Sequence, residues 1–390
     1  MIRIPRLVAG AVLVALSLSA CEVADVTDSS TYAVEGQGLS DANAFMRIKY
    51  GPHKANHLDL YLPKVRKFAK TPVLLYVHSG GWVDGEEDEV EYTPVVSEHM
   101  SLGWAVATVD FRLVGEPVVD DLGNVIKPTN PFPAQIRDVK RAIRFVKGYA
   151  NGCVTAVGWT WTIKLGSQSC DSSRRTNFDP NSVVVSGFSA GGHLAMLAAT
   201  SCSAATGEMV CPRWMEPRLD PNKPLDVPLI AQNSRPAASM AIAAVMNMRA
   251  ASKQALLIMP IRWLLKCGAW GTDCDYSGLH RLAPTRYLDA TDAPVYFAYG
   301  PKDTLLPEAT HVDPYVPKYE AALGTSRFWV DRMDGPAGRW LDRLPRPCFT
   351  CEPGDGVPEY YTVGGHDSFF MNAPAATAFL EKVRSGAINQ

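Results

Sequence analysis

Short apolar runs alternate along this chain with segments whose apolar residues recur at helical spacing. Residues 73–77, 105–109 and 183–185 are almost wholly apolar, as strands buried on both faces of a sheet are. Residues 136–146 carry apolar side chains at intervals of three and four, which places them on one face of a helix. This alternation predicts an α/β fold with a mostly parallel sheet and helices on both faces. Further strands are expected at residues 58–62, 241–246 and 295–299, and further helices at 190–199 and 373–383.

The length and composition fit a single large α/β domain. The chain has 390 residues, of which 47% are hydrophobic and 20% are charged, and both fractions are ordinary for a soluble globular protein. Lysine and arginine number 38 and aspartate and glutamate number 40, so the formal net charge is −2. Because nucleic-acid-binding domains show a basic face or a basic excess, this balance argues against a nucleic-acid partner.

The N-terminal residues have the pattern of an export signal. Two arginines precede an apolar stretch at residues 7–18, which is too short to span a bilayer. The sequence LSAC at residues 18–21 resembles a bacterial lipobox, and this resemblance implies cleavage before Cys21 and lipidation of that residue. An ordinary signal peptide cut near Ala20 is the alternative.

The chain is therefore expected to have three parts. Residues 1–20 form a lipoprotein signal peptide, residues 21–42 form a flexible tether that contains serine and glycine, and residues 43–390 form the folded domain. The lipid would anchor the exported protein to a bilayer of the cell envelope. Glu22 follows the lipidated cysteine, which by analogy with Gram-negative sorting favours the outer membrane.

Eight cysteines follow Cys21 and fall into four close pairs along the chain. An even number in an exported chain favours disulfides over free thiols. Zinc binding is the alternative, but the spacings are irregular and no histidine lies at zinc-finger spacing. The last pair also has the spacing of a redox motif, but prolines flank it where such a motif would begin a helix. We expect no metal site and the disulfides Cys153–Cys170, Cys202–Cys211, Cys267–Cys274 and Cys348–Cys351.

The most specific motif is GFSAGG at residues 187–192. It directly follows the apolar run at 183–185 and begins the expected helix at 190–199, which is the setting of a nucleophile elbow. A sharp strand-to-helix turn strains the serine backbone, so the residues two positions before and after it must be small. The helix N-terminus also favours negative charge that develops beside it. Ser189 is therefore the candidate nucleophile.

A second motif, HSGGW at residues 78–82, ends an apolar run and resembles the HGGG oxyanion loop of hormone-sensitive-lipase-like esterases. Glycines allow backbone N–H groups to approach an oxyanion closely, and one donor is worth about 3 kcal/mol of transition-state stabilisation. By this resemblance the oxyanion hole consists of Gly80, Gly81 and the N–H group of Ala190. Ser79 replaces the first glycine of the family motif.

The acid and the histidine of a triad are expected after the serine, in that order. The sequence GPKDTLLP follows the run at 295–299 and is similar to the acid loop of these hydrolases, which makes Asp303 the candidate acid. Asp313 is the neighbouring alternative, but it lacks this setting at a strand end. Near the C-terminus, the sequence YYTVGGHD places His366 at an expected strand end, and His366 is the candidate general base.

Three other histidines are weaker candidates for the base. His193 lies about one helical turn beyond the serine, and helix geometry carries it away from the strand end, so a packing role is expected. His280 and His311 are expected in loops, where they would be solvated.

These motifs span residues 45–383 and resemble bacterial α/β-hydrolase esterases related to hormone-sensitive lipase. The stretches LDLYLP, HSGGW, DFRL, DVKRAIRFV and GFSAGGHLA are most similar to the feruloyl and acetyl-xylan esterase-like branch. The resemblance implies the α/β-hydrolase fold and cleavage of carboxylic esters by Ser189, His366 and Asp303 through an acyl-enzyme, without a cofactor. The substrate would be a small-molecule or polysaccharide-linked ester. An amidase or peptidase of the same fold, similar to kynurenine formamidase, and a non-catalytic surface binding protein are the alternatives.

Only loops at the carboxyl ends of the strands reach the ligand in a parallel α/β sheet. Residues 249–283 follow the run at 241–246 and are expected to form a small cap over the site. Trp263 in this segment and Trp82 beside the oxyanion loop are the candidates for substrate contact. Packing of the cap on the body of the domain is the alternative role for the apolar residues at 258–265. Either residues 328–330 or residues 360–363 could form the last strand of the sheet, and the sequence does not decide between them.

Overall fold

The computed structural model describes ten ranges of the chain, and all of them lie within the compact unit of residues 32–390. The described ranges are 43–87, 92–115, 117–119, 125–157, 160–162, 170, 176–204, 209–267, 274–333 and 373–389.

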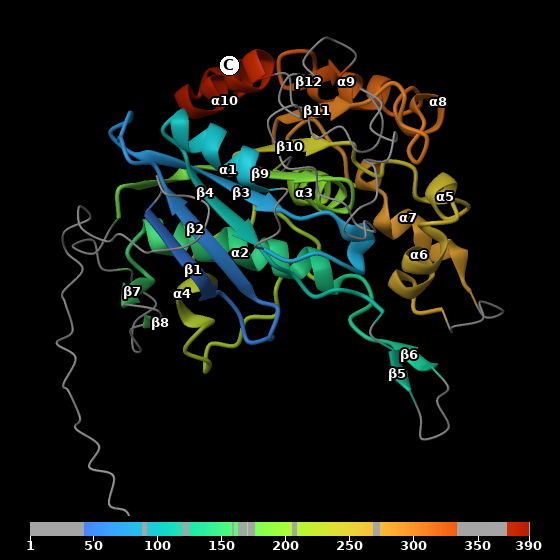
Figure 1. Ribbon diagram of the computed structural model, residues 1–390, viewed down its shortest axis with the longest axis horizontal. Coiled ribbons are helices and arrows are strands. Elements are labelled where there is room, and N and C mark those ends of the chain that lie inside the picture. Colours follow the sequence, from blue (N-terminus) through green and yellow to red (C-terminus); the bar gives the residue numbers. More distant parts are fainter. Residues whose placement is uncertain are drawn as a thin grey trace, which may run out of the picture. The chain divides into compact units, whose positions relative to one another are not determined.

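The centre of this unit is an eight-stranded, mostly parallel sheet (Figure 1). The strand order is β1-β2-β4-β3-β9-β10-β11-β12, and only β1 and β2 run antiparallel to their neighbours. The sheet confirms the α/β fold that the alternating runs predict. The bounds are β1 Asn43–Lys49, β2 His57–Leu62, β3 Thr71–Val77, β4 Ala105–Val109, β9 Phe178–Phe188, β10 Ala238–Ile242, β11 Val295–Tyr299 and β12 Phe328–Arg332.

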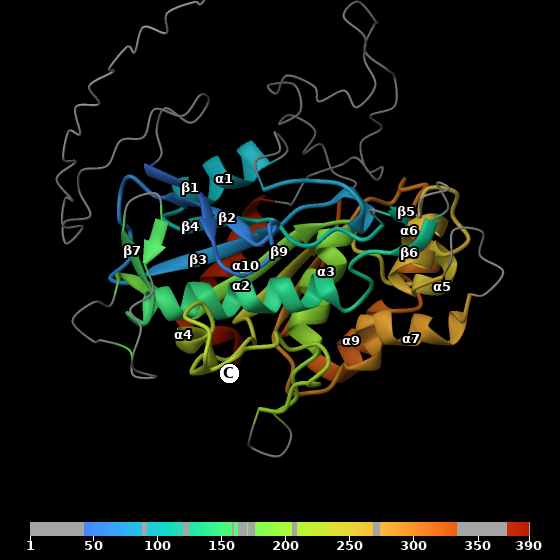
Figure 2. The same ribbon diagram turned by 90° about the horizontal axis from the view of Figure 1, so that it is seen from below.

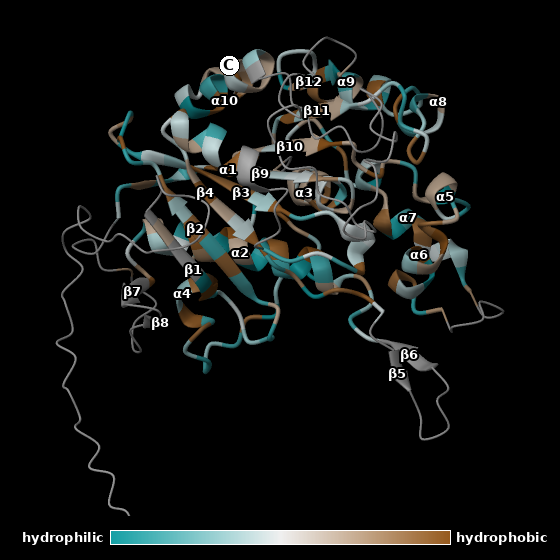
Figure 3. Cartoon of the chain, in the orientation of Figure 1, coloured by the Kyte–Doolittle hydropathy of each residue, from teal (hydrophilic) through white to brown (hydrophobic). Residues whose placement is uncertain are grey.

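Helices cover both faces of the sheet, as Figure 2 shows for α1 and α2. Alternate residues of β3 face opposite sides, because successive side chains of a strand point to opposite faces. Leu75 packs in the cluster that contains α2 (Ala134–Ala150) and α3 (Ala190–Thr200). Leu74 packs in the cluster that contains α1 (Tyr92–Ser101) and α10 (Ala373–Ser385). Figure 3 shows apolar residues along β4, whose five residues are all buried.

Shorter elements connect the strands at the sheet ends. Two ribbons, β5–β6 and β7–β8, pair antiparallel outside the main sheet. Among the described residues, no helix has the length and apolarity needed to cross a bilayer. The bounds are β5 Pro117–Val119, β6 Val125–Pro128, β7 Thr155–Val157, β8 Thr160–Thr162, α4 Val227–Ile230, α5 Met248–Ala251, α6 Ile258–Leu264, α7 Leu279–Leu282, α8 Glu308–His311 and α9 Val316–Leu323.

The strand expected at residues 241–246 is placed differently in the structure. Strand β10 ends at Ile242, and Ala243 has a φ of 43°, which turns the chain out of the extended conformation. Residues 243–246 are nevertheless buried, because they pack in three apolar clusters of the domain. Burial rather than strand formation therefore accounts for this apolar run.

The last described strand of the sheet is β12, which pairs parallel with β11. The alternative strand at residues 360–363 lies outside the described residues.

Three of the four expected disulfides are present. They join Cys153 to Cys170, Cys202 to Cys211 and Cys267 to Cys274, across 17, 9 and 7 positions. The pair Cys348–Cys351 and the lipobox Cys21 lie outside the described residues.

Candidate active site

Ser189 occupies a strained turn between β9 and α3. Its φ is 51° and its ψ is −112°, in a region that residues other than glycine rarely adopt. The neighbouring glycines leave room for this turn. A β-carbon on Gly191 would lie 2.1 Å from the Val77 carbonyl oxygen, and one on Gly187 would lie 2.5 Å from the Gly191 backbone. The glycines of the motif are therefore required by direct backbone contact.

The Ser189 backbone is held by the neighbouring strand. Its N–H group donates a hydrogen bond to the Ile242 carbonyl at 2.9 Å, and its carbonyl accepts one from His193 in the first turn of α3. The residue is 5% exposed. Ser189 therefore lies at the N-terminus of an eleven-residue helix, where the helix dipole favours negative charge.

The HSGGW segment forms a tight turn after β3. Gly80 has a φ of 84°, Gly81 of 60° and Trp82 of 66°, and the Val83 N–H group donates back to the Gly80 carbonyl at 3.0 Å. Within the described residues, no backbone hydrogen bond is donated by the Gly80 or Gly81 N–H groups. Both groups can therefore serve as donors to a ligand.

His78 supports the base of this turn. Its imidazole is fully buried and stacks on Phe111 at 4.2 Å between ring centroids. Its Nδ1 lies 3.1 Å from the Ser79 carbonyl and its Nε2 lies 3.6 Å from Asp110 Oδ1. These contacts fit a residue that stabilises the loop.

Strand pairing brings the two motifs together. Strands β3 and β9 are neighbours in the sheet, and Val77 lies opposite Gly187 in their register. The chain leaves both strands at the same edge, so Gly80 and Ser189 follow this pair by three and two residues. The candidate oxyanion loop and the candidate nucleophile therefore leave adjacent strands.

Asp303 lies in the loop after β11, as the sequence predicts. Its Oδ1 accepts hydrogen bonds from the N–H groups of Leu305 at 2.9 Å and Leu306 at 2.7 Å. The residue is 5% exposed, whereas the alternative Asp313 is exposed. These bonds fix the carboxylate at the carboxyl end of a sheet strand.

The candidate base His366 lies outside the described residues, so the structure gives no position for it relative to Ser189 and Asp303. The other histidines are placed. His193 is buried, lies edge-on to Trp82 at 5.2 Å, and donates from Nε2 to the Leu282 carbonyl at 2.6 Å. Burial lowers the pKa of His193 to about 4, so it is neutral at pH 7.

The expectation that His311 is a solvated loop histidine is wrong. His311 ends α8 and is 1% exposed, and its Nδ1 accepts a hydrogen bond from the Asn247 N–H group at 3.3 Å. This contact joins the segment after Asp303 to the segment after β10. His280 is exposed, as expected, but it lies in the short helix α7 and not in a loop.

Residues 249–283, called the cap segment below, contain α6 and α7 and pack against two loops of the domain. Trp263 lies against Gly115, because a β-carbon on that glycine would be 2.1 Å from the Trp263 ring. Leu257 and Pro260 both lie 3.9 Å from the β-carbon position of Gly81. The cap segment therefore contacts the oxyanion turn directly.

The two candidate substrate-contact tryptophans have different surroundings. Trp82 is fully buried, and its ring packs against His193. Trp263 is half-buried against Gly115. Both rings therefore have packing partners in the structure, and neither lines the cavity described next.

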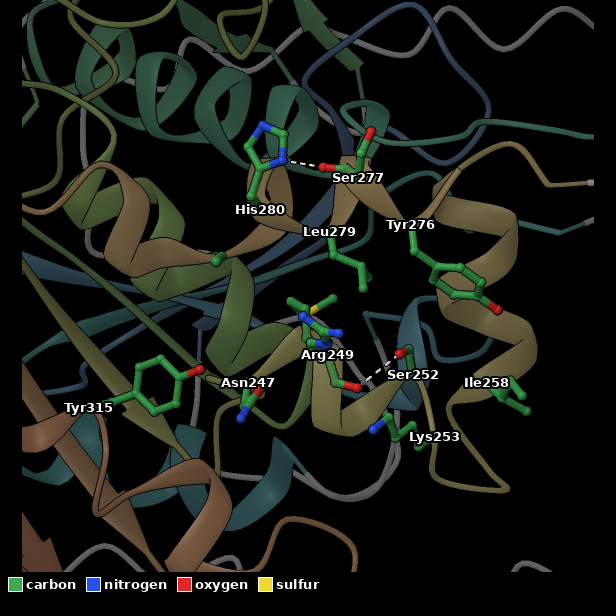
Figure 4. Close-up of a pocket in the computed structure, with 12 residues that line it drawn as sticks. Asn247, Arg249, Ser252, Lys253, Ile258, Tyr276, Ser277, Leu279, His280 and Tyr315 are labelled. Carbon is green, nitrogen blue, oxygen red and sulfur yellow. Dashed lines mark hydrogen bonds between the residues drawn. The ribbon is translucent and has the colours of Figure 1, made fainter. Parts of the chain in front are cut away.

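A cavity of about 810 Å³ is lined mostly by the cap segment, together with Asn247, Met248 and Tyr315 (Figure 4). Among its lining residues, only Ile258 belongs to the apolar run at 258–265. Its charged lining residues are Arg249 and Lys253, which are four positions apart. In a sequence alone, two cations at this spacing more often belong to a solvent-exposed surface than to a binding site. The cavity is lined by Asn247, Met248, Arg249, Ser252, Lys253, Ile258, Tyr276, Ser277, Leu279, His280, Ala283 and Tyr315.

One group of described residues has the composition of a metal site. Atoms of Cys202, Cys211 and Glu216 lie within 4.8 Å of one another. The two sulfurs are joined in a disulfide, so neither is available as a thiolate ligand. The Glu216 carboxylate is paired with Lys140 and Arg144, each at 2.7 Å. This group is therefore part of a buried ion-pair network.

Solved structures of esterases have a similar fold. A truncated form of a carbohydrate esterase from gut microbiota has a TM-score of 0.52 and 18% identity, covering 78% of this chain and 89% of that chain. The apo form of Thermogutta terrifontis esterase 2 has a TM-score of 0.51 and 16% identity, and the match covers 90% of this chain and 96% of that chain. A bifunctional GH43-CE protein of Bacteroides eggerthii has a TM-score of 0.55 and 19% identity, and the match covers 87% of this chain and 38% of that chain. At these identities the likeness shows the fold alone, which is the α/β-hydrolase fold.

Curated relatives include esterases of Mycobacterium tuberculosis. The probable carboxylic ester hydrolase LipM is 29% identical over 154 residues, which are 39% of this chain and 27% of that protein. Esterase LipQ is 24% identical over 265 residues, which are 67% of this chain and 49% of that protein. The chain thus spans about a quarter to a half of the length of these relatives.

The model of the BD-FAE family matches residues 58–153 and 170–313, which make up more than half of the chain. The match includes the candidate oxyanion turn, Ser189, the cap segment and Asp303, whereas His366 lies beyond it. This chain is therefore a member of the BD-FAE family.

Proposed function

We propose that this protein hydrolyses carboxylic esters and that Ser189 is its nucleophile. The observation that carries the proposal is the pairing of β3 with β9, which brings the Gly80–Gly81 turn and the strained Ser189 turn to the same sheet edge. A nucleophile beside preorganised backbone donors fits the demands of acyl transfer. The names of the curated relatives support ester hydrolysis as the reaction.

The reaction has two halves. The Ser189 oxygen attacks the carbonyl carbon while His366 takes the hydroxyl proton, and Asp303 orients the imidazole. The N–H groups of Gly80, Gly81 and Ala190 stabilise the oxyanion. The bond to the alcohol then breaks, and the alcohol leaves with the proton from His366. Water then attacks the acyl-enzyme while His366 takes a proton from it. The carboxylic acid product leaves, and the proton returns from His366 to the Ser189 oxygen.

The proposed substrates are small-molecule or polysaccharide-linked esters. One of the structural neighbours is named a carbohydrate esterase, which supports a sugar-linked ester as the substrate. A polysaccharide-linked substrate would also suit a protein held at the cell envelope.

The activity test compares the mature protein with Ser189→Ala on p-nitrophenyl acetate and butyrate. We expect hydrolysis by the wild type and the loss of nearly all turnover in the variant, with unchanged circular dichroism. Near-normal turnover by a folded Ser189→Ala protein would contradict the proposal. A faster reaction with N-formyl aromatic amides or dipeptides than with esters would favour the amidase or peptidase alternative.

We also propose that the protein is exported and anchored to the cell envelope through a lipid on Cys21, with the outer membrane as the favoured site. The support is the sequence pattern of residues 1–21 and the glutamate that follows. Wild-type protein should fractionate with membranes and carry the mass of the lipid, whereas Cys21→Ser should lose both properties. A Cys21→Ser protein that stays in the membrane fraction would contradict lipid anchoring at this residue.

A further inference from the structure

The cavity of the cap segment is lined by residues that neighbour three segments of the candidate active site. Its Ile258 stands between Leu257 and Pro260, which both contact the oxyanion turn. Its Ala283 follows Leu282, whose carbonyl accepts the hydrogen bond from His193 in the nucleophile helix. Two walls of the cavity are therefore continuous with the oxyanion turn and with α3.

The third wall is joined to the segment after the candidate acid. The Asn247 side chain donates to the Thr310 carbonyl at 3.1 Å, and its backbone N–H group donates to His311. Tyr315 lies four residues beyond and also lines the cavity. Ser189 does not line the cavity, so a group bound there would have to be joined through its neighbouring atoms to the ester at Ser189.

Among the described residues that line this cavity, the charged side chains are cationic, and the nearby carboxylate of Asp275 accepts a hydrogen bond from the Ser277 N–H group at 2.9 Å. Arg249 and Lys253 contribute cationic side chains, His280 contributes an imidazole, and none of the lining residues is an aspartate or a glutamate. Within the described ranges, neither Arg249 nor Lys253 pairs with a carboxylate. Both side chains are exposed, so neither cation carries a burial penalty before a ligand arrives.

Flat and apolar side chains complete the lining. Figure 4 shows Arg249 near the centre of the drawn residues, with Tyr276 and Ile258 to one side and Tyr315 to the other. Tyrosine rings offer apolar faces for a planar or sugar ring, and their hydroxyl groups can hydrogen-bond to its edge. The volume of about 810 Å³ is within the range of sites for small organic ligands.

We infer that this cavity is a subsite for an anionic, ring-bearing part of the ester substrate, with Arg249 and Lys253 binding a carboxylate. The inference rests on the proposed ester hydrolysis and names the substrate class that the same site would prefer. An arginine can hold a carboxylate through two parallel hydrogen bonds, and the lysine adds a second cation. The carboxylate could belong to an aromatic acid or to a uronic sugar, because the lining suits either ring.

The test uses two pairs of acetate esters in which a neutral group replaces the carboxylate of the anionic member. The aromatic pair is 4-acetoxybenzoate and its methyl ester, and the sugar pair is the acetylated methyl glycosides of glucuronic acid and glucose. The readout is the ratio of kcat/KM for the anionic member to that for the neutral member. Comparison of the two pairs shows which ring the subsite prefers.

The variants are Arg249→Gln and Lys253→Gln, with Arg281→Gln as the matched control. Arg281 is an exposed cation of the same segment that does not line the cavity. We expect the wild type to prefer an anionic member and the ratio to fall about tenfold in each cavity variant, the scale of one lost charge-assisted hydrogen bond. The control should keep the wild-type ratio, and added salt should lower the ratio in the wild type.

A wild-type ratio near one for both pairs would overturn the inference, and so would a ratio that falls equally in Arg281→Gln. In either case, turnover of the neutral esters would still support the proposed ester hydrolysis. Calorimetry with Ser189→Ala separates the two claims if no ester is hydrolysed. If Ser189→Ala binds 4-acetoxybenzoate and the double variant Ser189→Ala/Arg249→Gln binds it more weakly, the anionic subsite is supported even though no ester is hydrolysed. Absence of binding would overturn the subsite as well.

Discussion

The backbone N–H group of Ser189 donates a hydrogen bond to the carbonyl oxygen of Ile242, the last residue of β10. This bond ties the turn of the candidate nucleophile to the strand that leads into the cap segment. On the other side, β9 pairs with β3, which leads into the candidate oxyanion turn. Ser189 is thus held between the two strands whose following loops surround it.

The glycines of the elbow should tolerate no side chain. Gly191→Ala would place a β-carbon 2.1 Å from the Val77 carbonyl and 2.5 Å from the His78 carbonyl, so the turn must move. We expect a loss of about 3 kcal/mol or more in the free energy of unfolding. Ester hydrolysis per folded molecule should also fall, because Ser189 moves with the turn. Urea unfolding and active-site titration measure the two effects.

Gly324→Ala is the matched control for this prediction. Gly324 has a φ of 71° but nothing within 4 Å of its β-carbon position, so alanine there costs backbone strain alone. Because its ψ of 163° lies in a region that is essentially restricted to glycine, we expect a loss of about 1–3 kcal/mol with unchanged activity per folded molecule. Equal effects of the two substitutions would contradict the close-contact account of the elbow.

Asp303→Asn should lower kcat by about four orders of magnitude, because an amide cannot stabilise the histidine cation that forms during acyl transfer. The two backbone hydrogen bonds to Oδ1 can be kept by the amide oxygen, so the fold should persist. The control is Asp313→Asn, at the exposed alternative carboxylate nearby. Steady-state kinetics in which Asp313→Asn is the more damaging change would assign the acid to Asp313 instead.

All eight cysteines after Cys21 should be oxidised in the exported protein. Alkylation without reduction should leave them unmodified, and peptide mapping should recover the three bridges of the structure together with Cys348–Cys351. Replacing Cys202 and Cys211 by serine should lower stability by about 2.5 kcal/mol, the chain-entropy value for a loop of this length. A free thiol on Cys348 or Cys351 would contradict the fourth pairing.

Stability should fall as the pH drops from about 6.5 toward 4. Burial lowers the pKa of both His99 and His193 to about 4 in the folded chain, below the ordinary value of 6.5. The unfolded chain therefore binds protons first, and each histidine's contribution is present above pH 6.5 and lost as the pH falls toward 4. The loss amounts to roughly 3 kcal/mol for each histidine.

Urea unfolding between pH 7 and pH 4 checks this account. His99→Gln should flatten the pH dependence of the unfolding free energy, whereas His280→Gln, at an exposed position, should leave it unchanged. A His99→Gln protein with the wild-type slope would show that burial of His99 does not cause the acid sensitivity.

The parts of the fold that sequence predicts well are those where burial and backbone geometry agree. The apolar runs at 105–109 and 295–299 are strands with those bounds, and the helix expected at 190–199 is α3. Residues 241–246 are harder to predict, because the last four are apolar through packing in the core of the domain after the strand has ended. His311 is buried for a similar tertiary reason, through its contact with Asn247.

The elbow and the oxyanion turn could be located from sequence because their glycines are required by local backbone contacts. The cavity could not, because Arg249, Tyr276 and Tyr315 meet only through the folding of separate segments. The one sequence signal is the spacing of Arg249 and Lys253, four residues apart after a strand. This spacing points to an anion site only once the structure shows that both residues line one cavity whose described lining contains no aspartate or glutamate.

The most direct test of the account is covalent labelling of the mature protein with a fluorophosphonate, followed by mass spectrometry of its peptides. We expect one adduct, on the peptide that contains Ser189, and no adduct in Ser189→Ala. A folded, ester-hydrolysing protein whose adduct maps to another serine, or that forms none, would contradict the central role of Ser189.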